Sequence, residues 1–166
     1  SKPAPERILG AFLGLAICET IARPDQPDIV TPDPVTSLPH EGRFADGTSM
    51  ALSLAESFIA LRAFDPRDQM IRYTSWYRYG HLSSGETCDY IDESVRQATL
   101  RFERDWTPFD STGAENDLCL TRLVPVVAFA RTAAEARELC HESARVTHSG
   151  PATCEACASL GEILFH

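Results

Sequence analysis

Helical periodicity constrains this chain more than any other feature of its sequence. Apolar residues recur three or four positions apart in almost every segment outside one proline-rich stretch, which is the spacing of an amphipathic helix. Asp65-Pro66 is a typical helix start, and Gly80 a typical stop. We therefore predict an all-α fold with little or no sheet. The predicted helices are about seven, over residues 6–21, 48–63, 65–80, 90–104 and 118–130, from 132 and from 151.

Four of these helices carry finer expectations. The first should be mostly buried, with Gly10 and Gly14 packed closely against another backbone. Thr48 or Ser49 could cap the second helix. Pro125 should kink its helix or mark the first turn. A capping box, in which Thr132 and Glu135 each satisfy the other's free amide, should open the sixth helix.

Residues 22–43 interrupt the helical pattern. Their sequence contains Pro24, Pro27, Pro32, Pro34 and Pro39, and such a density of fixed φ angles and missing amide donors forbids a continuous helix or a central strand. We predict a long loop here. Loops of this length are usually either functional lids or disordered segments, and the residues alone do not choose between these two.

Length and charge limit the classes of function. With 166 residues, the chain is expected to form a single domain over 1–166. Its formal net charge of -9 disfavours binding to nucleic acid or to anionic membranes, because both carry negative charge. No apolar run approaches the roughly 18 residues that a membrane-spanning helix needs, and we expect a cytoplasmic protein.

The six cysteines are scattered through helical segments, which favours free thiols over disulfides. Cys154-x-x-Cys157 invites a zinc or redox interpretation, since Cys140, His141 and His148 lie upstream. However, the two cysteines follow Pro151 at helical spacing, where cysteine packs as a small apolar residue. We prefer this packed-helix interpretation.

Two carboxylates flank the proline-rich segment. Glu19 is near the end of the first predicted helix and Asp46 just before the second, so the fold could bring them together. Their oxygens, with the hydroxyls of Thr48 and Ser49, would suit Mg²⁺. The alternative is that Asp46 and Thr48 simply cap a helix.

Several longer motifs, taken together and in this order, resemble those of one protein family. They are Arg7-Ile-Leu-Gly-Ala-Phe-Leu-Gly-Leu-Ala-Ile17, Phe44-Ala-Asp-Gly-Thr-Ser-Met-Ala-Leu52, Asp65-Pro-Arg-Asp-Gln-Met-Ile-Arg-Tyr73 with Trp76-Tyr77, Arg96-Gln-Ala98, Arg122-Leu-Val-Pro-Val126 and Thr147-His148 followed by Pro151. They look like the N-terminal half of the DraG-type ADP-ribosylglycohydrolases. The resemblance implies a compact orthogonal helical bundle, truncated at the C-terminus, and an ancestry of enzymes that use two Mg²⁺ ions to remove ADP-ribose from modified side chains.

The resemblance also implies site residues. Where the family's first metal motif reads Thr-Asp-Asp-Thr, this chain has Ala45-Asp46-Gly47-Thr48, which leaves Asp46 and Thr48 as remnant metal ligands. Glu19 falls within the family's Gly-Asp-Ala run and is the candidate catalytic residue, as a water or ribose contact. Asp92 lies in the segment matching Asp-Ile-Gly-Asn, and Asn116 and Asp117 in the one matching Gly-Asn-Gly-Ser. These three are the candidate substrate-binding residues.

The departures from the family pattern shape the functional prediction. The family's later Asp-x-Asp-Thr motif, which supplies other metal carboxylates, has no counterpart here, so Mg²⁺ should bind weakly or not at all. We expect a protein that is catalytically impaired alone. It would act as a binding or regulatory module for ADP-ribose or an ADP-ribosylated protein, or as one half of a composite hydrolase completed by a second chain or a homo-oligomer. The alternative is an active Mg²⁺-dependent hydrolase.

Overall fold

The computed structural model describes residues 2–22 and 42–166, and all regular elements in these ranges are helical. This confirms the all-α prediction and its seven α-helices. Most of the predicted loop over 22–43 lies outside the described residues. The elements are α1 (Pro5–Ile21), α2 (Asp46–Leu61), α3 (Pro66–Tyr79), α4 (Glu93–Asp105), the 3₁₀ helix η2 (Leu118–Arg122), α5 (Val124–Phe129), α6 (Ala133–Arg145) and α7 (Pro151–Phe165).

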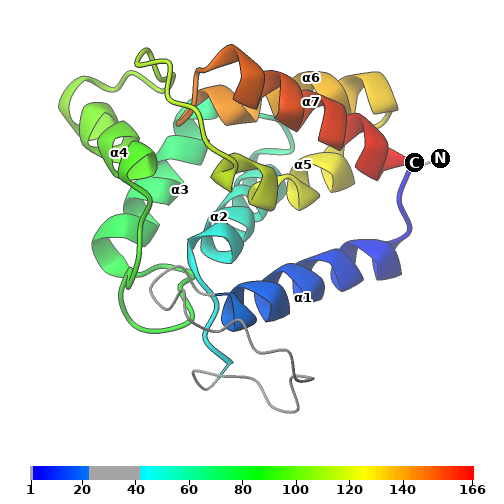
Figure 1. Ribbon diagram of the computed structural model, residues 1–166, viewed down its shortest axis with the longest axis horizontal. Coiled ribbons are helices and arrows are strands. Elements are labelled where there is room, and N and C mark those ends of the chain that lie inside the picture. Colours follow the sequence, from blue (N-terminus) through cyan, green and yellow to red (C-terminus); the bar gives the residue numbers. More distant parts are fainter. Residues whose placement is uncertain (1, 23–41) are drawn as a thin grey trace.

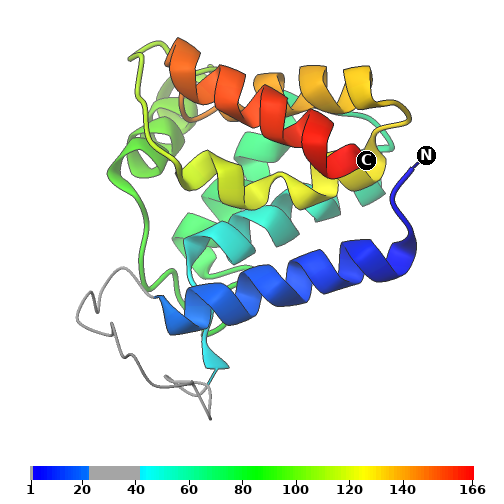
Figure 2. The same ribbon diagram turned by 45° about the vertical axis from the view of Figure 1, so that its right-hand side comes forward.

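The helices are stacked in tiers (Figures 1 and 2). α6 and α7 lie side by side on one side of α2 and α5, and α1 runs along the opposite edge. α3 lies beside α2, and α4 packs against α3. One core cluster joins α2, η2 and α5 to α6 and α7, and a second joins α2 to α3 and α4. α2 contributes to both, so its position determines how the two halves of the core meet. None of the described helices is both long enough and apolar enough to cross a membrane.

The prediction that the first helix is mostly buried was wrong for α1. It was expected to be mostly buried, but Leu9, Leu13 and Ile17 are 61%, 55% and 44% exposed, and Thr20 alone among its residues is buried. No heavy atom from outside the local backbone lies within 4 Å of a Cβ built at Gly10 or Gly14, so these glycines do not mark a close helix contact.

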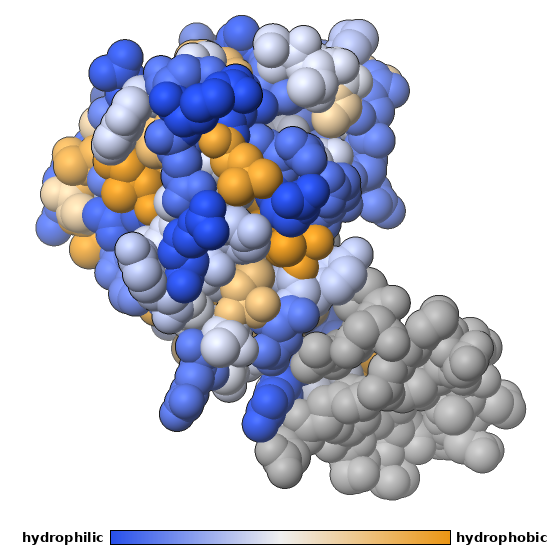
Figure 3. All heavy atoms as spheres, turned by 90° about the vertical axis from the view of Figure 1, so that its left-hand side faces the viewer, coloured by the Kyte–Doolittle hydropathy of each residue, from blue (hydrophilic) through white to orange (hydrophobic). Residues whose placement is uncertain are grey.

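Figure 3 shows a different surface over α3 and α4, where hydrophilic residues predominate and hydrophobic ones form small separate groups.

Most helix ends lie where the capping residues and prolines in the sequence predicted them. The Asp65 carboxylate accepts hydrogen bonds from the amides of Arg67 and Asp68, as an N-cap should, and α3 ends before Gly80. Pro125 lies in the first turn of α5, which was one of its two predicted roles.

Two helix starts differ from the expectation. α4 begins at Glu93 rather than near residue 90, because the Asp92 carboxylate caps it by accepting from the amides of Ser94 and Val95. The capping box of α6 is only half formed. The Thr132 hydroxyl accepts from the Glu135 amide, but the Glu135 carboxylate accepts from the amide of Arg131 instead of Thr132.

The contact between α6 and α7 makes a sharp prediction. A Cβ on Gly161 would overlap the sulfur of Cys140, whereas a Cβ on Gly14 would meet open space. Gly161→Ala should therefore lower the free energy of unfolding by about 1–3 kcal/mol through overpacking. The matched control Gly14→Ala should raise it by up to about 1 kcal/mol through helix propensity. Urea denaturation of both variants measures these changes. Equal effects on the free energy of unfolding would contradict the close contact between Gly161 and Cys140.

Candidate functional site

Glu19 holds the N-terminus of α2. Its Oε2 accepts hydrogen bonds from the Ala45 amide at 3.2 Å, the Thr48 amide at 2.9 Å and the Thr48 hydroxyl at 2.6 Å. The residue at the N-cap position is Ala45, which has no side chain able to cap. The prediction that Thr48 or Ser49 caps this helix was thus wrong. The cap by Asp46 and Thr48, which was the alternative to a Mg²⁺ site, is not formed either. The capping group comes from α1.

Gly47 leaves the space that this cap requires. A Cβ at this position would overlap the Glu19 carboxylate and the Thr121 hydroxyl. An aspartate here, as in the motif that the segment resembles, would need Glu19 and η2 to move. The replacement of that aspartate by glycine and the capping by Glu19 are therefore two parts of the same local arrangement.

Asp46 is a buried carboxylate, 3% exposed, in the first turn of α2. Its Oδ1 accepts a hydrogen bond from the Gly47 amide at 3.1 Å, while Oδ2 is buried without a hydrogen-bond partner. Burial, and next the charge of Glu19, raise the pKa of Asp46 to about 6, against the opposing effect of the backbone amides of Asp92 and Gly47. A carboxylate oxygen left without a partner is costly, which makes it a candidate ligand-binding atom.

Asp92 and Asn116 form a second part of the site. The Asp92 carboxylate uses Oδ1 to cap α4, and its Oδ2 accepts a hydrogen bond from the Asn116 side-chain amide at 3.2 Å. The Asn116 side-chain oxygen in turn accepts from the amide of Leu118, at the start of η2. These bonds orient both side chains before any ligand binds.

The fold brings five of the six predicted site residues to one cleft of about 580 Å³. Glu19, Asp46, Asp92, Asn116 and Asp117 all line it, between α1, the N-termini of α2 and α4, and η2. Thr48 does not line it, because its hydroxyl is turned to Glu19. The catalytic, metal and substrate roles of these residues remain predictions. Among the described residues, the lining is Leu15, Cys18, Glu19, Ala22, Ala45, Asp46, Tyr90, Asp92, Asn116, Asp117, Leu118 and Thr121, with four carboxylates and no Lys, Arg or His.

Behind Asp92 lies a buried polar chain that the sequence reasoning did not assign to the site. Arg122 donates to the Thr147 hydroxyl at 2.7 Å, and this hydroxyl lies 2.7 Å from His148 Nδ1. The hydroxyl can therefore donate to Nδ1, which leaves the proton of His148 on Nε2, 3.8 Å from Asp92 Oδ1 and without a hydrogen bond. The motif Thr147-His148, which contributed to the family resemblance, was the sequence signal that could have assigned these residues to the site.

The described residues do not by themselves form a magnesium site. They contain no group of three His, Cys, Asp or Glu side chains placed to hold a metal ion. Asp46 Oδ2 offers one free buried oxygen, and the oxygen of Thr48 is engaged with Glu19. Mg²⁺ needs several oxygens in near-octahedral geometry, so the remaining ligands would have to come from outside the described residues.

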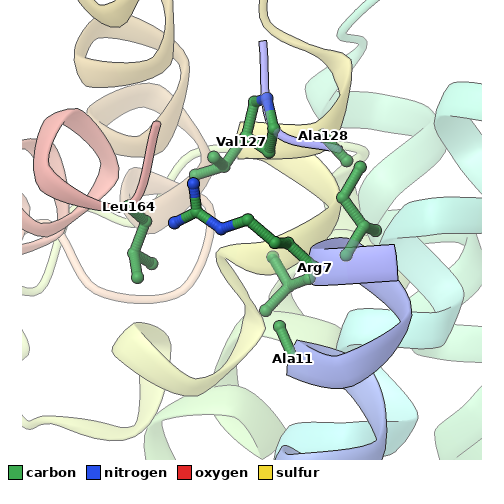
Figure 4. Close-up of a pocket in the computed structure, with 8 residues that line it drawn as sticks. Arg7, Ala11, Val127, Ala128 and Leu164 are labelled. Carbon is green, nitrogen blue, oxygen red and sulfur yellow. The ribbon is translucent and has the colours of Figure 1, made fainter. Parts of the chain in front are cut away.

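Two other regions are less suited to catalysis. The pocket in Figure 4 lies between α1, α5 and α7, where Arg7 extends toward Leu164 and Val127 among apolar side chains, and it contains no carboxylate. Cys154 and Cys157 are buried in the core cluster of α7, which confirms that they pack as apolar residues. All six cysteines are free thiols, as predicted.

Loss of the Glu19 carboxylate should loosen the contact between α1 and α2. We expect Glu19→Ala to lower the free energy of unfolding by about 1–3 kcal/mol, because it leaves amides at the start of α2 without a partner. The control is Cys18→Ala, an exposed neighbour on the same helix whose sulfur caps nothing. Denaturant unfolding compares them, and a Glu19→Ala variant as stable as the control would show that the cap contributes nothing.

Acid should destabilise the protein through His148. Burial, and next the charge of Arg122, lower the pKa of His148 to about 4 from 6.5. The unfolded chain therefore binds a proton at higher pH than the folded one, and stability falls as the pH drops from 6.5 toward 4, by roughly 3 kcal/mol.

An NMR titration of the histidine rings should find His148 neutral at pH 5. In urea unfolding at pH 7 and pH 4.5, His148→Gln should lose less stability on acidification than the unaltered protein does. Parallel losses in the two proteins would refute the assignment.

Comparison with known proteins identifies the family. A sequence profile of the ADP-ribosylglycohydrolase family matches residues 1–166. The chain is 29% identical to the ADP-ribosylarginine hydrolase Tri1 of Serratia proteamaculans (strain 568), with 96% of this chain and 46% of the relative covered. It is 24% identical to the ADP-ribosyl-[dinitrogen reductase] glycohydrolase of Rhodospirillum rubrum, with 97% and 58% covered.

A solved structure shares the fold. The chain superposes on a protein described as an ADP-ribosylglycohydrolase-related protein complex with a TM-score of 0.68, at 32% identity, covering 93% of this chain and 53% of that one. The chain thus spans about half the length of the relatives it matches. The profile match over all its residues and this structural likeness together show that the chain belongs to the ADP-ribosylglycohydrolase family.

Proposed function

We propose that the acidic cleft receives the ADP-ribosylated arginine side chain of a modified protein, and that this chain does not release the ADP-ribose unaided. The observation that carries the proposal is the lining of the cleft, which among the described residues has four carboxylates and no basic side chain. Such a lining attracts a cation and repels phosphate groups, so the guanidinium of the modified side chain would enter the cleft while the diphosphate of the same ligand lies outside it. A guanidinium is a cation that carboxylates bind well, through paired hydrogen bonds.

The relatives support this class of ligand. One is named an ADP-ribosylarginine hydrolase, and another a glycohydrolase of ADP-ribosylated dinitrogen reductase. Within the cleft, Asp92 and Asn116 are already oriented by their mutual hydrogen bond, and Asp46 Oδ2 is the buried oxygen without a partner. These three groups are the proposed contacts to the modified side chain.

The lack of unaided turnover follows from the donor atoms. Hydrolysis that depends on Mg²⁺ needs several ligand oxygens around the ion, and the described residues contain no group of three His, Cys, Asp or Glu side chains placed to hold one. The chain would then serve as a binding or regulatory module for an ADP-ribosylated protein, or as one half of a composite hydrolase.

The surface of α1 favours the composite form. Leu9, Leu13 and Ile17 lie on successive turns of α1 and expose apolar side chains along the helix that leads to Cys18 and Glu19 in the cleft. An exposed apolar stripe of this kind is typical of an interaction surface. A further polypeptide, either a different chain or another copy of this one, could cover the stripe and bring oxygen ligands to Asp46.

We expect the isolated protein to bind an ADP-ribosylarginine peptide and to leave it intact. Titration calorimetry with and without Mg²⁺ measures binding, chromatography of the same samples measures released ADP-ribose, and light scattering gives the mass in solution. Asp92→Asn should weaken binding at least several-fold, because it removes a charge that faces the guanidinium. Cys18→Ala, which also lines the cleft, should change it little.

Three outcomes would revise the proposal. Release of ADP-ribose that stops in Asp46→Ala would identify an active Mg²⁺-dependent hydrolase. Equal binding of a peptide ADP-ribosylated on serine would remove the role of the guanidinium. No binding at all would mean that the family fold is kept here as a scaffold for other interactions.

A further inference from the structure

Two buried cysteines from different elements lie in direct contact. The sulfurs of Cys119, in η2, and Cys157, in α7, are 3.5 Å apart, and neither residue has any exposed surface. The two positions are separated by 38 residues. Spacing along the sequence paired Cys157 with Cys154, but the Cys154 thiol donates to the backbone oxygen of His148 instead.

Next to this pair is a buried cation without a carboxylate partner. Arg122 is fully buried and donates to the backbone oxygen of Ser143 and to the Thr147 hydroxyl, both neutral, while its guanidinium lies over the ring of Tyr73. No carboxylate in the described part of the chain lies within ion-pair distance of it. A buried charge of this kind strongly favours a nearby anion.

Cys119 is placed to become that anion. Hydrogen bonding from the Cys157 thiol, and next the charge of Arg122, lower the pKa of Cys119 below that of an ordinary thiol, against burial and the charge of Asp117. Burial acts without such compensation on Cys140, whose pKa it raises to about 12. The thiolate is the reactive form of cysteine, so Cys119 is the nucleophile of the pair and Cys157 its neighbouring partner.

We propose that Cys119 and Cys157 are a redox site that forms a reversible disulfide when the protein meets a peroxide. The Cys119 thiolate attacks one peroxide oxygen, the O–O bond breaks, and hydroxide leaves and is protonated to water. This makes a sulfenic acid on Cys119. The Cys157 sulfur then attacks the Cys119 sulfur, the S–O bond breaks, and a second water leaves with the proton of Cys157. Two thiols and one hydrogen peroxide thus give one disulfide and two waters.

The disulfide would act on the cleft. Bond formation must shorten the distance between the sulfurs from 3.5 Å to about 2 Å, which draws η2 and α7 together. Asn116, Asp117, Leu118 and Thr121, in and just before η2, line the cleft on its other side. Oxidation would therefore shift that wall against Glu19 and Asp92, whatever ligand the cleft binds.

Thiol counting on the native protein tests the proposal. The folded protein is exposed to hydrogen peroxide, then denatured in N-ethylmaleimide, and its mass and peptides are measured. Because two of its six cysteines would be consumed, four should be alkylated, and one linked peptide pair should contain Cys119 and Cys157. Dithiothreitol given before alkylation should restore all six. Hydrogen peroxide is the suitable oxidant because it is small enough to reach buried thiols through local opening.

Two variants sharpen the result. In Cys157→Ser, whose hydroxyl can still donate to the Cys119 sulfur, the sulfenic acid on Cys119 has no thiol partner and should be trapped by dimedone, whereas Cys18→Ala should form the disulfide as the unaltered protein does. Six alkylated thiols after peroxide treatment of the unaltered protein, or a linked pair other than Cys119 with Cys157, would overturn the proposal. These readouts do not depend on ADP-ribose, so they stand apart from the function proposed above.

Discussion

The carboxylate of Glu19 is the contact on which the arrangement of the cleft depends. It satisfies amides at the start of α2 from a position 26 to 29 residues earlier in the chain. These hydrogen bonds connect α1 to α2, the helix that both core clusters share. α1 has few buried side chains of its own. The hydrogen bonds also require a glycine at position 47 and turn the Thr48 hydroxyl inward. One capping interaction thus sets the position of a helix, the identity of a residue and the orientation of the Thr48 hydroxyl.

Electrostatics explain why this cleft differs from an ordinary depression in the surface. Four carboxylates line it with no Lys or Arg among the described lining residues, and burial, then the charge of Glu19, raise the pKa of Asp46. Arg122, the last residue of η2, is fully buried and does not line the cleft, and its charge acts on Cys119 and His148. The fold therefore separates an acidic site from a basic core by one short 3₁₀ helix. A ligand on one side and a chemical change on the other can both move that helix.

Much of the fold was predictable from local patterns, because the information for a helix end lies within a few residues of it. Asp65-Pro66 opens α3 and Pro151 opens α7, since a capping carboxylate or a proline in the first turn acts on its own backbone. The family resemblance added the candidate site residues, five of which meet at one cleft. Helical spacing could not say which apolar face is covered, and Leu9, Leu13 and Ile17 are consequently exposed where burial was expected.

The sequence by itself thus determined the helical elements, most of their ends and the set of acidic residues that mark the site. Tertiary structure alone decided that Glu19 caps α2, that His148 faces Asp92, and that Cys157 contacts Cys119 rather than Cys154. The physical reason is the range of the interactions. A capping side chain or a proline acts within one helical turn, whereas each of these three contacts joins residues 29 to 56 positions apart and exists only once the helices have packed.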